Sequence, residues 1–464
     1  MLATPPLSLD TLLAGSPFRS YCYSYPHKTA YRKFAPLPLS QVWSEEDLSA
    51  LFLYLHIPFC EYRCGFCNLF TLSQPEQGLT TRYLDALERQ VETTVAALPQ
   101  ARFAQTAIGG GTPTFLTTPE LERLFGLLCG PLGVRQGETP LGIEASPATI
   151  NDEKLALLQE QGVERFSMGI QSFSTADVHA MGRPQRAEEA FAALELVGRY
   201  NFPVVNLDLI YGGAGQTHDA WRESVRLAID YRPQELFLYP LYVRPLTGLG
   251  KRGVPTDKEW DAWRITAYRQ AREQLLQAGY EQVSLRMFRL PAPPGEVHRV
   301  SQTHDKTYDE TNDSPTVYRC QEDGMLGLGS GSRSYTRGLH YSREYAVGSR
   351  AIRNILGDFL QSTADDFAQV DYGFPLNDDE QRRRYLILSL LQAAGLATGD
   401  YQQRFGVPVE ADFPELHALA DHGLAVCTAD HWRLTAAGLE WSDAIGPWFY
   451  SAAVARQMED YPWR

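Results

Sequence analysis

The sequence predicts an α/β chain whose core is a partial (β/α)6 TIM-like barrel, with an N-terminal extension and a small C-terminal winged-helix-like α+β domain. Two observations predict this fold. Apolar runs typical of buried strands alternate with helical patterns six times between residues 51 and 278. From about residue 375 the alternation stops, and helical patterns with one pair of strand-like segments follow. Serial β-then-α units form a parallel sheet covered by helices, and six units fall short of the eight that close a barrel.

Each apolar run is followed by a segment with helical spacing of its apolar residues. The longest such segment spans 257–278, where Trp260, Trp263, Ala267 and Ala271 fall on one face. The strands are expected at 51–57, 103–108, 141–145, 165–170, 204–210 and 235–241, and the helices near 80–98, 117–128, 151–161, 186–200, 217–230 and 257–278.

The segments that flank the barrel have a different composition. Residues 1–48 are rich in Pro, Ser and Tyr and are expected to wrap on the body of the protein as an extension. The barrel core is assigned to 49–290. A linker that begins with a Pro-rich stretch and continues into a glycine-rich segment, 291–370, is expected to complete the active site. Residues 371–464 are assigned to the C-terminal winged-helix-like domain.

Composition narrows the class of protein. The formal net charge of −14 over 464 residues argues against broad binding to nucleic acids or anionic membranes. No apolar run approaches the roughly 18 residues of a membrane span, and the first residues lack the pattern of a secretory signal. We therefore expect a cytoplasmic protein. Three of the seven cysteines crowd into eight residues, a spacing that favours a metal site over a disulfide framework.

Cys60, Cys64 and Cys67 form a C-x-x-x-C-x-x-C motif directly after the first predicted strand. Three soft thiolates from one turn select an iron–sulfur cluster or zinc. In a [4Fe–4S] cluster, three protein ligands leave one iron open, and this iron can chelate the amino and carboxylate groups of S-adenosylmethionine (SAM). One electron from the cluster then cleaves the S–C5′ bond, and the resulting 5′-deoxyadenosyl radical abstracts hydrogen from a substrate.

The alternative interpretation of the cysteine motif is a zinc knuckle. Zinc needs a fourth Cys or His nearby, and the NLFTLSQ segment after Cys67 has neither. His56 is too close to the motif, on the preceding strand. Phe66, just before the last cysteine, fits the pattern of radical SAM proteins. The motif therefore favours the cluster.

Polar residues or glycines end the later strands. The second strand ends in the run Gly109–Thr114, and the next three end at Glu144, Gln171 and Asp208. Glycines allow a backbone to approach a ligand closely. An isolated acid is usually a salt-bridge partner, but polar residues that recur at one end of a parallel barrel indicate a common site. Arg183 follows the fourth strand, and the plain alternative for it is an ion pair with Asp208.

The sequence resembles the oxygen-independent coproporphyrinogen III oxidase-like family of radical SAM proteins. The similarity runs from roughly residue 20 to 345, with a weaker match in the C-terminal domain. The segments that carry it are YLHIPFCEYRCGFC, GGGTPTFL, IEASPATI, RFSMGIQSF, NLDLIYG and MLGLGSGSRSY.

This resemblance implies two ligand sites. SAM on the cluster would contact Tyr54, Phe66, Gly110, Glu144 and the backbone near Arg333. Family members with a second SAM use positions that match Gly111, Thr112, Gln171, Arg183 and Asp208. The second place would hold another SAM or the substrate. Glu144, Arg183 and Asp208 are the expected catalytic residues, and a reductant such as flavodoxin or ferredoxin is the expected partner.

Two departures from the family pattern keep the reaction open. Coproporphyrinogen oxidases carry a further cysteine two residues after the cluster motif, where this sequence has Leu69. The related haem chaperones carry an H-N-x-x-Y-W motif where this sequence reads Pro315–Cys320. Three hypotheses follow: a coproporphyrinogen dehydrogenase-like oxidoreductase acting on a small organic or tetrapyrrole substrate, a radical C-methyltransferase that uses a second SAM, and a haem chaperone.

Overall fold

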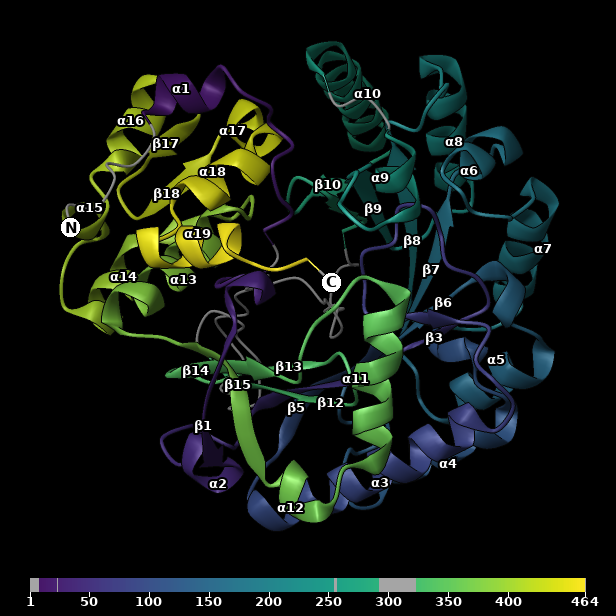
Figure 1. Ribbon diagram of the computed structural model, residues 1–464. Coiled ribbons are helices and arrows are strands. Elements are labelled where there is room, and N and C mark those ends of the chain that lie inside the picture. The colour runs from purple at the N-terminus through teal and green to yellow at the C-terminus, as the bar shows by residue number, and fades with distance from the viewer. Residues whose placement is uncertain (1–7, 23, 254–256, 292–322, 464) are drawn as a thin grey trace.

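The centre of the protein is a 13-stranded mixed sheet in which six parallel strands from successive parts of the chain lie side by side. The computed structural model describes residues 8–22, 24–253, 257–291 and 323–463. The parallel strands occur in chain order and confirm the predicted (β/α)6 core (Figure 1). They are β2 (Leu51–Ile57), β5 (Phe103–Gly110), β6 (Leu141–Ala145), β7 (Arg165–Gln171), β8 (Val204–Tyr211) and β9 (Glu235–Pro240).

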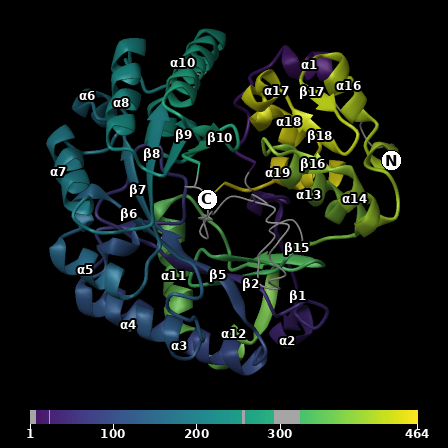
Figure 2. The same ribbon diagram turned by 180° about the vertical axis from the view of Figure 1, so that it is seen from behind.

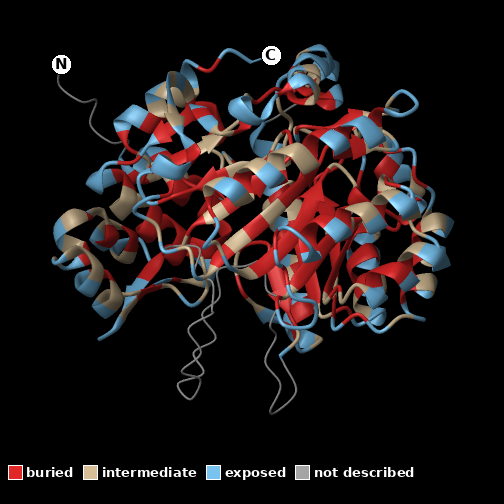
Figure 3. Cartoon of the chain, turned by 90° about the horizontal axis from the view of Figure 1, so that it is seen from below, coloured by how far each residue is buried: buried red, intermediate tan, exposed pale blue. Residues whose placement is uncertain are grey.

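Helices cover the outer face of these strands (Figures 1 and 2). Their ends are set by side-chain caps, as where Thr217 accepts the Ala220 N–H and Asp257 accepts the Trp260 N–H. Buried residues run along the strands while the outer helix faces are exposed (Figure 3). The helices are α3 (Leu79–Ala97), α4 (Thr118–Cys129), α5 (Asp152–Glu160), α6 (Thr175–Ala180), α7 (Ala187–Val197), α8 (His218–Asp230), α9 (Gly248–Arg252) and α10 (Lys258–Gln277).

The sheet continues beyond both sides of the parallel core. On one side β12 (Met325–Leu328) pairs in parallel with β2, and the next strands are antiparallel: β13 (Arg333–Tyr335), β14 (Leu339–Ser342), β15 (Gln369–Pro375) and β1 (Arg32–Pro38). On the other side β11 (Met287–Arg289) and β10 (Glu281–Gln282) follow β9. Helix α2 (Leu39–Val42) packs against β1 and β15, α12 (Ala364–Phe367) packs against β15 and α3, and α11 (Ser349–Gln361) packs against α3. Residues 292–322 of the predicted linker lie outside the described residues.

The C-terminal unit has its own three-stranded sheet and hydrophobic core. The predicted boundary at residue 371 falls inside β15, a strand of the large sheet, and the separate unit begins after it with α13 (Asp378–Leu390). The remaining elements are β16 (Leu396–Ala397), α14 (Thr398–Phe405), α15 (Val409–Asp412), α16 (Glu415–Asp421), β17 (Ala425–Cys427), β18 (His431–Leu434), α17 (Ala436–Glu440), α18 (Ser442–Trp448) and α19 (Ala452–Glu459).

The N-terminal segment packs into the core of this C-terminal unit. Helix α1 (Leu9–Leu13), Tyr25 and Tyr31 share that core. The Tyr25 hydroxyl donates to the Glu380 carboxylate and accepts the Ser451 N–H at 3.1 Å. Because β1 then pairs with β15, the N-terminal segment joins the small unit to the large sheet.

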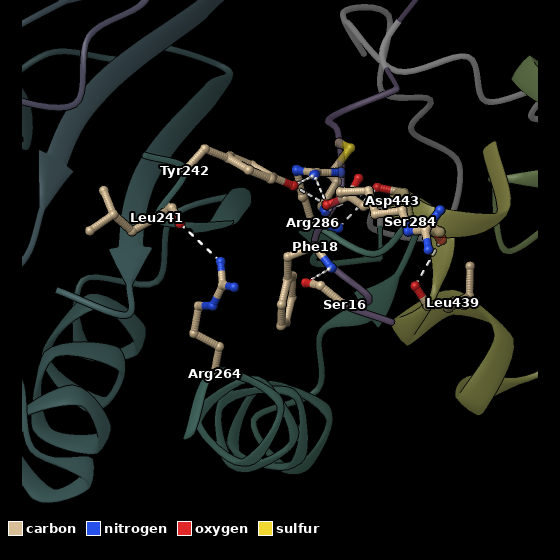
Figure 4. Close-up of polar contacts among 12 residues, drawn as sticks. Ser16, Phe18, Leu241, Tyr242, Arg264, Ser284, Arg286, Leu439 and Asp443 are labelled. Carbon is tan, nitrogen blue, oxygen red and sulfur yellow. Dashed lines mark hydrogen bonds and ion pairs between the residues drawn. The ribbon is translucent and has the colours of Figure 1, made fainter. Parts of the chain in front are cut away.

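A buried ion pair links the C-terminal unit to the barrel (Figure 4). Arg286 Nη2 lies 2.5 Å from Asp443 Oδ2, and the two side chains are 6% and 1% exposed. The Tyr242 hydroxyl donates to the same carboxylate, and the Arg286 guanidinium stacks 3.8 Å from the Tyr21 ring centroid. Two charges removed from water are costly unless both are paired. The pair therefore specifies how the C-terminal unit sits on the barrel.

We expect Asp443→Ala to destabilise the protein by about 3–5 kcal/mol, because it leaves the buried Arg286 charge without a partner. Urea denaturation followed by circular dichroism measures this loss. The matched control is Asp219→Ala, since Asp219 is 86% exposed in its ion pair with Arg222 and should matter little. Equal midpoints for the two variants would contradict the role given to the buried pair.

Candidate functional site

The inner side of the partial barrel opens into one cavity of about 2130 Å³. This exceeds the roughly 300–1000 Å³ of ordinary small-molecule pockets. The cavity is lined by strand ends, the cysteine loop, the N-terminal segment and the C-terminal unit. All candidate residues from the sequence line it: Tyr54, Cys60, Cys64, Phe66, Cys67, Gly110, Gly111, Thr112, Glu144, Gln171, Arg183, Asp208 and Arg333.

The three cysteines of the motif are free thiols, and each has its own polar neighbour. Thr112 Oγ1 lies 3.6 Å from Cys60 Sγ, and Arg183 Nη1 lies 3.5 Å from Cys64 Sγ. Thr71 Oγ1 lies 3.6 Å from Cys67 Sγ. Hydrogen bonds to cluster sulfurs are one of the ways in which a protein tunes an iron–sulfur centre. The surroundings of the thiols therefore fit a cluster held by this loop.

Each thiolate of a [4Fe–4S] cluster binds a different iron, so the three sulfurs need not converge on one point. Among the described residues, no three His, Cys, Asp or Glu side chains form a site for a single metal ion. Burial raises the pKa of Cys60 to about 12, and the neighbouring Cys67 adds to this effect. Iron binding would therefore release protons from the thiols.

The cysteine loop is held against the glycine run at the end of β5. The Gly111 N–H donates to the Ile57 carbonyl at 2.8 Å, and the Thr112 N–H donates to the Phe59 carbonyl at 2.7 Å. A Cβ at Gly111 would lie 2.5 Å from the Phe59 carbonyl oxygen and 2.8 Å from Cys60 Sγ. Only glycine fits there. The close contact and the Gly111 N–H hydrogen bond therefore fix the position of the cysteine loop.

His56 has a structural role beside the loop. Its Nε2 lies 3.0 Å from the Phe70 carbonyl, and burial lowers the pKa of the imidazole to about 4. The ring is thus neutral at physiological pH and is engaged away from the thiols.

Glu144 and Asp208 present two perturbed carboxyl groups to the cavity. Burial raises the pKa of Glu144 to about 7, against a hydrogen bond from the Gly110 N–H at 3.0 Å, and the Asp208 charge raises it further. Burial raises the pKa of Asp208 to about 6, against a hydrogen bond from Asn206 Nδ2 at 2.8 Å. A cationic ligand would favour the ionised forms of both groups. The positively charged sulfonium of SAM has this property.

Gln171 ends β7, Arg183 lies in the loop between α6 and α7, and both line the cavity. Gln171 has a φ of +69° at a register shift between β7 and β8, a backbone device that re-aims a side chain at the end of a strand. Arg183 donates to Cys64 Sγ, to the Gly169 carbonyl at 2.8 Å and to Gln185 Oε1 at 2.8 Å. Arg183 and Asp208, which are both described, form no ion pair with each other. The structure therefore contradicts the plain alternative for Arg183.

Several cavity residues come from segments that the motifs do not mark. Tyr239 lies one residue before the end of the sixth strand, Arg286 precedes β11, and Lys28 and Asp443 come from the two ends of the chain. The strand pattern could have indicated Tyr239, because it extends the series of strand ends by one. The other three carry no local signal. Cys320 and the segment Pro315–Cys320 lie outside the described residues.

Comparison with protein families agrees with the predicted relationship. The Radical SAM superfamily matches residues 54–228, and the HemN C-terminal domain matches residues 376–441. Among the described residues, no helix is both long and apolar enough for a membrane span.

Individual relatives carry two different names. The chain is 27% identical over 388 residues to the haem chaperone HemW of Bacillus subtilis, covering 80% of this chain and 91% of that protein. It is 28% identical over 396 residues to an oxygen-independent coproporphyrinogen III oxidase of Pseudomonas aeruginosa, covering 84% and 83%. The structure of coproporphyrinogen III oxidase (HemN) from Escherichia coli superposes with a TM-score of 0.75 at 23% identity, covering 92% and 96%. That likeness confirms the fold.

We predict that the anaerobically reconstituted chain binds about four irons and four sulfides. Changing Cys60, Cys64 and Cys67 together to Ala should abolish the cluster absorbance, because these thiolates are its only proposed ligands. Iron and sulfide analysis with visible spectra measures this. The control changes Cys129 and Cys427, which are both exposed, and should load normally. A cluster retained by the triple variant would refute the assignment.

We predict that Glu144→Gln weakens SAM binding while iron content and melting temperature stay nearly unchanged. The glutamine oxygen can still accept the Gly110 N–H, so only the charge is lost. In the parent protein, SAM affinity should fall as the pH drops through about 7, because the Glu144 carboxyl then becomes protonated. Calorimetry across pH should show a weaker pH dependence in the variant. Unfolding with unchanged SAM affinity would instead mark Glu144 as structural.

Proposed function

We propose that this chain, which combines a radical SAM domain with a HemN C-terminal domain and resembles the oxygen-independent coproporphyrinogen III oxidase-like family, is a radical SAM enzyme. It would cleave SAM reductively and abstract hydrogen from a small organic or tetrapyrrole substrate. One observation carries the proposal: the three thiols of the motif face the same large cavity as two carboxyl groups, Glu144 and Asp208, whose pKa values are raised. Such perturbed groups in a cleft are typical of functional sites.

In this proposal, Cys60, Cys64 and Cys67 hold a [4Fe–4S] cluster that leaves one iron open to SAM. When bound, the cluster supplies one electron, delivered by a reductant such as flavodoxin or ferredoxin, that splits SAM into methionine and a 5′-deoxyadenosyl radical. Glu144 attracts the cationic part of SAM, and the walls of the cavity keep water away from the radical. The remaining SAM contacts are assigned to Tyr54, Phe66, Gly110 and the backbone near Arg333.

We assign Gly111, Thr112, Gln171, Arg183 and Asp208 to a second ligand site in the cavity. Thr112 and Arg183 also reach cysteine sulfurs, so they would act on the cluster as well as on a ligand. Gln171 and Asp208 then offer an amide and a carboxylate to a hydroxyl or amino group of that ligand. Because Asp208 prefers a cation or a hydrogen-bond donor, it favours SAM or a polar substrate in this place.

A radical C-methyltransferase is the second candidate, and the size of the cavity favours it. About 2130 Å³ leaves room beside one SAM for a second SAM or a large substrate. A haem chaperone is the third, in line with the name of the Bacillus subtilis relative. The H-N-x-x-Y-W motif of such chaperones is missing from this sequence, which favours the two enzymatic candidates.

Product analysis separates the three candidates. The reconstituted protein should cleave SAM when dithionite is added without oxygen, and chromatography of the products identifies the reaction. 5′-Deoxyadenosine alone supports the hydrogen-abstracting enzyme, and S-adenosylhomocysteine beside it supports the methyltransferase. Absence of both products, together with tight haem binding, would overturn the enzymatic proposal.

We expect Asp208→Asn to lower the rate of product formation by about tenfold or more, the usual effect of losing a charge that contacts a reacting ligand. The asparagine keeps the shape of the side chain, so iron content and binding of the first SAM should remain. The control is Asp219→Asn, an 86% exposed residue of α8. Unchanged turnover in Asp208→Asn would show that the second ligand lies elsewhere.

A further inference from the structure

The N-terminal segment carries an ammonium group into the cavity. Lys28 begins the short helix η1 (Lys28–Ala30), is only 9% exposed and lines the cavity wall. Its Nζ lies 3.8 Å from the centroid of the Tyr345 ring, on the face that attracts cations. Among the described residues, no salt bridge is recorded for Lys28.

The Tyr345 ring connects this ammonium group to the cysteine loop. The Tyr345 hydroxyl donates to the Asn68 carbonyl at 2.7 Å, and Asn68 directly follows Cys67. The Tyr345 carbonyl accepts the Tyr461 hydroxyl at 2.7 Å, so Tyr461 fixes the backbone that carries the ring. Lys28 therefore packs on a tyrosine ring whose hydroxyl is hydrogen-bonded to the cysteine loop.

Burial and the nearby Cys67 thiolate act on the pKa of Lys28 in opposite directions. Burial, with a smaller effect of the like charge on Arg333, lowers the pKa of Lys28 well below its usual range, whereas the Cys67 thiolate raises it. A buried lysine costs free energy unless an anion is near. A cluster bound through three thiolates supplies that negative charge, and it gains one more unit when it is reduced. A fixed cation stabilises the reduced form more than the oxidised form.

We propose that Lys28 raises the reduction potential of the cluster held by Cys60, Cys64 and Cys67, and so makes the cluster easier to reduce. The inference rests on the proposed function, because it requires a cluster at these cysteines. Lys28 would thus be a residue of the N-terminal segment, outside the barrel, that influences the electron-accepting cluster. Net charge, hydrogen bonds and solvent exposure are the factors that set such potentials.

The test is a potentiometric titration of the reconstituted protein without SAM, in which electron paramagnetic resonance reports the reduced cluster. Lys28→Met keeps most of the side-chain length and removes the charge, so its midpoint should move to a more negative potential. Lys28→Arg keeps the charge and should stay near the parent value. Lys33→Met is the control, because Lys33 is 70% exposed in its ion pair with Glu344 and should leave the midpoint unchanged.

The outcomes separate this inference from the proposed function. A parent protein that takes up no cluster would defeat the proposed function itself. A Lys28→Met protein with full iron content and the parent midpoint would defeat only the role of Lys28. If Lys28→Met fails to load iron, Lys28→Gln is titrated under the same criterion. A shift of equal size in Lys33→Met would also overturn the inference, since it would show a general effect of net charge.

Discussion

Six parallel strands do not close on themselves, and the rest of this structure depends on how their open sides are used. β12 adds to the free side of β2, and β11 adds to the free side of β9. Beyond β12 the sheet ends at β1, which belongs to the N-terminal segment. This segment in turn shares a core with the C-terminal unit. The inner face of the sheet is thereby enclosed by both ends of the chain, and the space between them is the cavity.

Parallel pairing explains why the candidate residues from the barrel could be predicted from sequence. Neighbouring strands are in register, so side chains near their carboxyl ends meet at one edge. Five of the expected strands begin and end within one residue of the observed ones, and the second extends two residues further, to Gly110. Local patterns suffice here because each βα unit is compact in sequence.

The sequence did not predict contacts between distant segments. The apolar pattern does not reveal that Arg183 reaches Cys64, because the two are 119 residues apart and the bond depends on how a loop turns. The Arg286–Asp443 pair likewise joins residues 157 positions apart. Strands β12–β14 are only three or four residues long, too short for a period-2 pattern to stand out. Such features follow from tertiary packing.

The contact between Tyr25 and Ser451 bears on the order of events during protein synthesis. The two residues are separated by 426 positions, and the N-terminal segment shares its core with helices that are made last. A ribosome adding roughly 5–20 residues per second therefore exposes the three cysteines long before the C-terminal unit is made, and until then the N-terminal segment lacks the core into which it packs. During that interval the cysteine loop is open to solvent, and the C-terminal segment encloses it only when Tyr461 reaches Tyr345, whose hydroxyl donates to the Asn68 carbonyl.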